Sequence, residues 1–133
     1  MIGPLTPTQT AAEYYSDAFG WPVGCTSRAV WLRIPAQLTA LAIPESLANE
    51  LLLPGPAIRY PGRPPRHVHL VIAPTRMNCD STSQLNARDI IRLGYRCLLD
   101  LPPTQIVEGP LTWVSEPSPG RDLPTFASIL RKL

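Results

Sequence analysis

Both histidines of the chain lie in one short apolar run, Arg66 to Ile72 (RHVHLVI). The run is rich in β-branched residues and has proline on both sides, a pattern typical of a buried strand. Side chains alternate along a strand, so His67 and His69 are predicted to project from the same face. Two imidazoles at this spacing suit either a zinc site or contacts with an anion such as phosphate.

A zinc site needs further ligands, which would have to come from Cys79, Asp80 or Cys97. None of these residues has a ligand spacing typical of zinc motifs, so we expect no metal and no cofactor. Cysteine chemistry is also unexpected. Cys25 and Cys97 fall in predicted strands, where a free cysteine acts as a small core residue, and Cys79 has no neighbouring base. A phosphodiesterase with two separate histidine motifs is excluded, because the chain has only two histidines.

Arginines surround the histidine run. Arg59, Arg63 and Arg66 lie on or beside the predicted hairpin that contains it, and Arg96 lies on a later strand. Guanidinium groups match the geometry of phosphate oxygens, which favours an anion site that includes His69. The alternative is a solvated hairpin whose arginines serve solubility and whose histidine bonds to a backbone carbonyl. The sequence leaves both interpretations open.

The bulk composition predicts one soluble domain. A chain of 133 residues has room for a single core, and 44% hydrophobic with 17% charged residues is ordinary for a globular protein. The net charge of +2 is too small to indicate nucleic-acid binding unless the basic residues cluster. Three cysteines without a CxxC pair favour a reducing compartment, and no apolar run reaches membrane-spanning length. We therefore expect a cytoplasmic protein that does not enter a membrane.

The 17 prolines break the chain into short elements. The first helix is clearly marked, because Thr6-Pro7-Thr8-Gln9 has the form of a capping box and Gly20 follows the helix. Residues 35–43 fit a strand or a helical turn equally well. Met1 to Leu5 is expected to be flexible. The other predicted elements are strands at 21–25 and 28–34, a helix at 44–53, a hairpin of 57–60 with 66–73, a polar loop at 78–83, a short helix ending near 91, strands at 95–99 and 111–114, and a last helix from Leu123 with Asp122 as its N-cap.

Four pieces of the chain, in this order, resemble the bifunctional DNA primase/polymerase (Prim-Pol) domain of the archaeo-eukaryotic primase superfamily. They are the opening helix with Gly20-Trp21-Pro22-Val23, the run Arg66 to Ile72, the segment Leu93 to Thr104 (LGYRCLLDLPPT), and Leu111-Thr112-Trp113-Val114. The resemblance implies an α/β (α+β) single domain over residues 1–133, with a mainly antiparallel sheet packed by helices, as a reduced primase-polymerase-like core. It also implies that His69 helps to hold nucleotide phosphates.

The chain departs from this family where the family binds metal. An Asp-x-Asp pair before the histidine strand holds divalent cations in the family, and the matching segment here, Ala40 to Pro44 (ALAIP), has Ala42 and Pro44 instead. The third metal-binding acid of the family could correspond to Asp89, but this match requires a shift of one residue in the alignment. Two-metal nucleotidyl transfer needs closely placed carboxylates. The resemblance therefore implies a short degenerate form that is not an enzyme.

We expect a catalytically inactive accessory or regulatory domain that binds single-stranded nucleic acid or nucleotide weakly. The residues expected to bind are Arg59, Arg63, Arg66, His69 and Arg96. The aromatic residues that could stack on bases are Trp21, Trp31, Trp113, Tyr60 and Tyr95, although the tryptophans are expected in the core. Two other functions stay open: a protein–protein interaction module that uses the old active-site cleft or a sheet edge, and an active nucleotidyl transferase.

Overall fold

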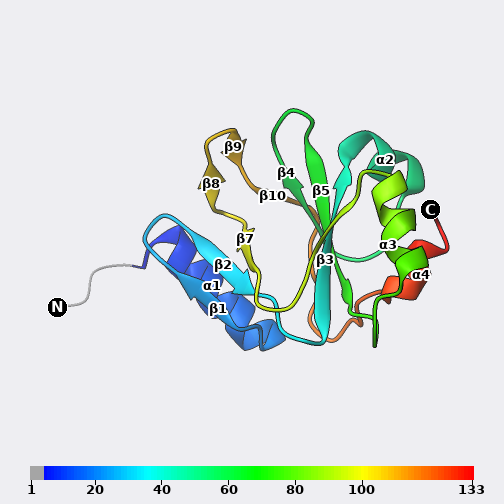
Figure 1. Cartoon of the computed structure of the whole chain (residues 1–133). Helices are drawn as coiled ribbons and strands as arrows, with labels where there is room; N and C mark the ends of the chain where they lie inside the picture. Colours follow the sequence, from blue (N-terminus) through cyan, green and yellow to red (C-terminus); the bar gives the residue numbers. More distant parts are fainter. Residues whose placement is uncertain (1–4) are drawn as a thin grey trace.

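Two seven-residue strands, β3 (Leu38–Pro44) and β5 (Arg66–Ile72), pair antiparallel at the centre of the protein. The computed structural model describes residues 5–133, and the expected flexibility of Met1 to Leu5 falls mostly outside this range. Nearly every side chain of β3 and β5 is buried. Both faces of this strand pair are therefore covered, as Figure 1 shows.

These two strands form the middle of a five-stranded antiparallel sheet with the order β10-β4-β5-β3-β6. A second antiparallel sheet has the order β1-β2-β7, and β8 pairs with β9 in a small hairpin. The bounds of the other strands are β1 Val23–Cys25, β2 Val30–Arg33, β4 Ala57–Tyr60, β6 Ile91–Leu93, β7 Leu98–Leu101, β8 Gln105–Ile106, β9 Gly109–Pro110 and β10 Thr112–Ser115. The expected α+β class with antiparallel sheets is confirmed.

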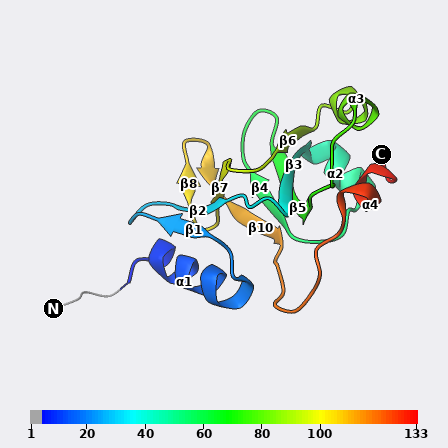
Figure 2. The same ribbon diagram turned by 60° about the horizontal axis from the view of Figure 1, so that its bottom comes forward.

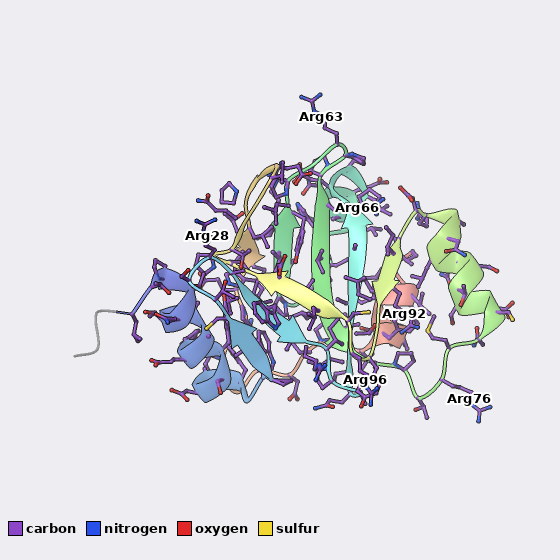
Figure 3. The ribbon with its side chains drawn as sticks, turned by 60° about the vertical axis from the view of Figure 1, so that its left-hand side comes forward. Arg28, Arg63, Arg66, Arg76, Arg92 and Arg96 are labelled. Carbon is purple, nitrogen blue, oxygen red and sulfur yellow. The ribbon has the colours of Figure 1, made fainter. Side chains whose placement is uncertain are left out.

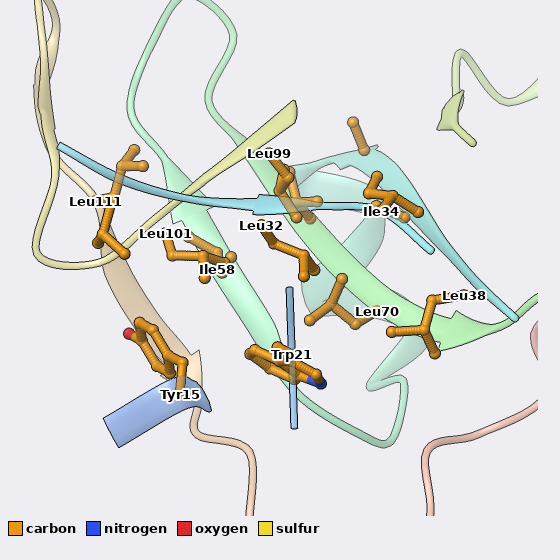
Figure 4. Packing of buried hydrophobic residues seen from close by; sticks show 14 residues of the cluster. Tyr15, Trp21, Leu32, Ile34, Leu38, Ile58, Leu70, Leu99, Leu101 and Leu111 are labelled. Carbon is orange, nitrogen blue, oxygen red and sulfur yellow. The ribbon is translucent and has the colours of Figure 1, made fainter. Parts of the chain in front are cut away.

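The five-stranded sheet separates two hydrophobic cores. The helices α2 (Glu45–Leu51), α3 (Cys79–Ala87) and α4 (Phe126–Leu130) lie on the side that Leu41, Ile43 and Val71 face. The three-stranded sheet and α1 (Pro7–Phe19) enclose the larger core on the other side (Figures 1 and 2). Figure 4 shows this larger core, in which Leu32, Ile58 and Leu70 meet.

Helix α1 begins and ends as its sequence predicts. The Thr6 side chain accepts a hydrogen bond from the Gln9 backbone N–H at 3.2 Å, and Gln9 Oε1 accepts from the Thr6 N–H at 2.8 Å. Gly20 ends the helix with φ of 67°, a left-handed conformation that glycine adopts without strain. The helix therefore has a fixed length and delivers Trp21 into the core.

The structure corrects several expected boundaries. Within residues 35–43, which are ambiguous in sequence, the central strand β3 begins at Leu38 and continues to Pro44. The expected loop at 78–83 is wrong, because Asn78 caps α3 by accepting from the Ser81 N–H at 2.7 Å. Ile91 belongs to strand β6 rather than to that helix. The last helix starts at Phe126, with Thr125 and not Asp122 as its N-cap.

Two expectations about core residues are also wrong. Trp31 lies on β2 between the buried Val30 and Leu32, so its side chain faces away from the core that they enter. Cys97 is exposed and precedes strand β7. Trp21 and Trp113 do pack with the larger core, as expected.

We predict that a side chain of the larger core contributes far more to stability than an exposed apolar side chain. Leu70→Ala should lower the free energy of unfolding by about 2–5 kcal/mol, because it leaves a cavity at a fully buried site. Leu98→Ala removes the same atoms from a side chain that is 60% exposed and should change stability by no more than about 0.5 kcal/mol. Urea unfolding of both variants compares them, and equal losses would contradict this assignment of the core.

Candidate nucleic-acid interface

His67 belongs to a partly buried cluster with Glu45 and Arg59 at the start of α2. Its Nε2 lies 3.0 Å from Glu45 Oε2, and Arg59 Nε donates to the same oxygen at 2.6 Å. Strand pairing produces this arrangement, because Arg59 lies directly opposite His67 in the β4–β5 register. The hydrogen bond from Arg59, followed by that with His67, lowers the pKa of the Glu45 carboxyl. Arg59 is thus engaged within the fold.

His69 lies on the same face, deeper in the sheet. Its side chain is flanked by Leu41 and Ala57 on the neighbouring strands, and the residue is only 4% exposed. Neither ring nitrogen reaches the surface or has a hydrogen-bond partner among residues 5–133. Burial, with a smaller effect of His67, lowers the pKa of His69 to about 4. The imidazole is therefore neutral at physiological pH and is shielded from any phosphate.

The positions that the resemblance aligns with metal-binding acids lie on the other face of the sheet. Ala42 pairs with Val68 and Pro44 with Arg66, so both alternate with the histidine positions. Ala42 is part of the larger core between the two sheets. Ala42, Pro44 and His69 do not converge on one cleft.

The remaining expected binding residues are separated from one another. Arg66 is engaged, because its Nη1 donates to the Asp89 carbonyl at 2.8 Å and its Nη2 to the Asp89 carboxylate at 3.0 Å. Arg63 projects from the tip of the β4–β5 hairpin, and Arg96 lies far from it beyond β6 (Figure 3). The expected set of five residues is therefore not one site.

Arg96 instead belongs to a group of basic and aromatic residues around the connection from β6 to β7. The Tyr95 side chain is 62% exposed, and the guanidinium carbon of Arg96 lies 5.2 Å from the centre of its ring. Arg92 folds back over Gly94, so closely that a Cβ on this glycine would lie 2.7 Å from Arg92 Nη1. The Arg96 guanidinium thus lies against the exposed Tyr95 ring, and the Arg92 guanidinium lies beside the neighbouring Gly94.

The outer face of the three-stranded sheet continues this surface. The Arg96 N–H donates to the Ile34 carbonyl at 2.9 Å, which places Arg96 beside the end of β2. The adjacent Arg33 lies opposite Leu98. The Trp31 ring lies over Gly24, where a Cβ would come within 2.7 Å of the indole nitrogen. Trp31, Arg33 and Leu98 line a shallow hollow of about 330 Å³.

We call Trp31, Arg33, Arg92, Tyr95 and Arg96 the basic aromatic surface. Within residues 5–133, its three arginines form no ion pair, whereas Arg59 and Arg66 do. Figure 3 shows Arg92 and Arg96 near each other, whereas Arg28, Arg63 and Arg76 lie apart from them and from one another.

Sequence reasoning found Arg96 and named Tyr95 as a stacking candidate, but it missed Arg33, Arg92 and the outward position of Trp31. The signal was present in two places. Trp31 and Arg33 alternate with buried residues along β2, and Arg92, Tyr95 and Arg96 flank a glycine. What the sequence could not supply is the pairing of β2 with β7, which brings the two segments together.

Comparisons with protein-family models, with curated proteins and with solved structures gave no match. In the part of the chain that the structure describes, no helix combines the length and apolar character needed to span a bilayer. Among the same residues, no three side chains of His, Cys, Asp or Glu gather as metal ligands would.

We predict that acid destabilises the protein through His69. Between pH 6.5 and about 4 the unfolded chain binds a proton that the folded chain excludes, so the free energy of unfolding falls as pH falls through this window. The loss should reach about 3 kcal/mol at the lower end, since one pKa unit corresponds to about 1.4 kcal/mol. Urea unfolding at several pH values measures it.

The variant His69→Leu should flatten this pH dependence, because it removes the titrating group and keeps an apolar side chain of similar size. The control Glu45→Gln should change the pH dependence of the free energy of unfolding only at lower pH. The lowered pKa of Glu45 means that its stabilising effect is present above its ordinary value of 4.5 and is lost below it. An unchanged slope in His69→Leu would show that other groups cause the acid sensitivity.

Proposed function

We propose that the protein binds single-stranded nucleic acid through the basic aromatic surface, as an accessory or regulatory domain without nucleotidyl transferase activity. The observation that supports this function most directly is the exposed Tyr95 ring with Arg96 against it. Among residues 5–133, Arg96 and the two other arginines of the surface, Arg33 and Arg92, form no ion pair. Proteins that bind single strands combine a positively charged path for the backbone with aromatic rings on which bases stack.

The surface offers both kinds of contact. Tyr95 and Trp31 provide rings for stacking, and Arg33, Arg92 and Arg96 provide guanidinium groups for phosphates. Hydrogen bonds of the sheet hold the backbone beneath them, so few groups must be ordered on binding. Three phosphate contacts are few, which favours weak binding without sequence preference.

The resemblance to a Prim-Pol domain supports the same class of ligand. A domain of this ancestry that kept nucleic-acid contacts and lost the metal-binding acids would have alanine and proline where Ala42 and Pro44 stand. The three free thiols fit a role in the reducing cytoplasm. Nucleic acid therefore remains the favoured ligand, with the contact surface moved from the histidine strand to the basic aromatic surface.

The charge contacts can be tested by salt dependence. A fluorescein-labelled oligothymidylate, followed by fluorescence anisotropy over a series of KCl concentrations, should bind in the micromolar range and weaken as salt rises. Arg92→Ala/Arg96→Ala should weaken binding and lower the slope of log K against log salt by about 1.4, or about 0.7 per lost contact. Arg131→Ala/Lys132→Ala removes the same charge from the exposed end of α4 and should change little.

The stacking contact has its own variant. Tyr95→Ala should reduce the free energy of binding by about 1–3 kcal/mol without changing the salt slope, because it removes a ring and no charge. Val107→Ala, in the turn of the β8–β9 hairpin, is the matched control for an exposed apolar side chain. Absence of any salt-dependent binding, or equal losses in the surface variants and their controls, would overturn the proposed function.

We further predict no nucleotidyl transfer. A primed template with labelled deoxynucleotides and Mg²⁺ or Mn²⁺ should give no extended product, because Ala42 and Pro44 cannot bind a cation. Metal-dependent extension by the purified chain, abolished in a variant of Asp89, would instead show that a carboxylate site exists and would replace the proposed function with catalysis.

A further inference from the structure

A second surface lies between α1 and strand β10, on a different side of the molecule. In Figure 2, α1 and the loop that follows β10 lie at the bottom of the view and β6 at the top. The surface is a groove of about 370 Å³, lined mainly by aromatic rings and proline. Its principal lining residues are Tyr14, Tyr15, Trp113, Pro102, Pro103 and Glu116.

Internal hydrogen bonds hold the walls of the groove in place. The Tyr15 hydroxyl donates to the Pro102 carbonyl at 2.6 Å, and Trp113 Nε1 donates to the Tyr15 oxygen at 3.0 Å. The Tyr14 ring meets Phe19 edge-on, with centroids 5.6 Å apart. A groove whose rings are already fixed loses little conformational entropy when it is filled.

Tyr14 provides the polar contact that the groove offers to a ligand. Its side chain is half exposed, and its hydroxyl makes no hydrogen bond with any residue in 5–133. The polar hydrogens of Tyr15 and Trp113 are already used within the fold. A ligand with unpaired carbonyl oxygens would therefore find an apolar floor and one hydroxyl donor.

The charge of the groove is negative. Glu116 lines it, and Asp17 lies one helical turn after Tyr14 on α1. Among residues 5–133, neither carboxylate forms an ion pair. The same Glu116 also lines an adjoining hollow of about 340 Å³ that contains Asp122 and one arginine, Arg121. The groove thus offers an unpaired carboxylate to a cationic side chain.

We propose that this groove binds a proline-rich segment of a partner protein, in polyproline II conformation, with an arginine or lysine that contacts Glu116. Polyproline II has no internal hydrogen bonds, so its carbonyls can accept from Tyr14, and its proline rings pack well between aromatic side chains. The basic residue fixes the direction of the peptide by pairing with the carboxylate. The surface shares no residue with the basic aromatic surface, so this inference does not depend on nucleic-acid binding.

Synthetic peptides test the proposal on the whole chain. The probe is a fluorescein-labelled peptide with the pattern Arg-x-x-Pro-x-x-Pro, and its two variants replace both prolines with alanine or the arginine with glutamate. Fluorescence anisotropy should show saturable binding of the first peptide and at least about tenfold weaker binding of both variants. ¹H–¹⁵N spectra should show shifts confined to α1, Trp113 and Glu116.

Protein variants then separate the two contacts. Tyr14→Ala should lower the affinity for the first peptide about tenfold, whereas Val107→Ala should leave it unchanged. Glu116→Gln should weaken the arginine peptide but not the same peptide with alanine in place of arginine, and Glu108→Gln is its matched control on an exposed turn. Circular dichroism checks that each variant is folded.

Three outcomes would overturn the proposal. The first is no saturable binding of any proline-rich peptide. The second is an affinity that stays the same when the prolines of the peptide are replaced and when Glu116 is changed to Gln. The third is concentration-dependent self-association that Tyr14→Ala abolishes, measured by sedimentation. It would assign the groove to a second copy of the chain, whose own residues 61–66 (PGRPPR) combine proline and arginine.

Discussion

The pairing of β3 with β5 is the interaction on which the rest of the structure depends. Seven residue pairs join these strands, and each face of the pair forms the floor of a hydrophobic core. Any polar side chain on either strand must therefore be neutral or paired within the protein. His67 meets this condition through Glu45, and His69 meets it by losing its charge. Strand β5, which carries both histidines, therefore serves to stabilise the fold. The proposed binding surfaces lie elsewhere, on exposed parts of the molecule.

Much of the fold follows from local signals. The capping box at Thr6 and Gln9 and the proline-bounded β4–β5 hairpin act within a few residues, so the sequence predicts them well. Strand β6 was missed because its three residues are stabilised by pairing with β3, about fifty residues earlier in the chain. Residues 35–43 were ambiguous because β3 is buried on both faces, and such burial removes the alternation that identifies a strand. Errors therefore gather where distant pairing, rather than local preference, decides the structure.

The candidate site was predictable only in part. Alternation placed His67 and His69 on one face, but it could not show that α2 and the smaller core cover that face. The ion pairs of the neighbouring arginines could not be predicted either, because their acidic partners, Glu45 and Asp89, lie 14 and 23 residues away. Conversely, β2 and β7 bring Trp31 and Arg33 to Arg96 from a distant part of the chain. A basic residue contributes to an anion site only when no carboxylate already holds it, and that condition is tertiary.

A net charge of +2 conceals local differences in charge. Among residues 5–133, the three arginines of the basic aromatic surface form no ion pair. Glu116 lines the aromatic groove beside α1, and Asp122 lines the hollow next to it. Under the proposed function, this distribution would favour approach to a nucleic acid through the basic aromatic surface rather than through the groove. A strand bound at the basic aromatic surface would therefore leave the groove facing solvent. Because the two surfaces share no residue, the two proposals together would let the domain link a nucleic acid to a proline-rich protein.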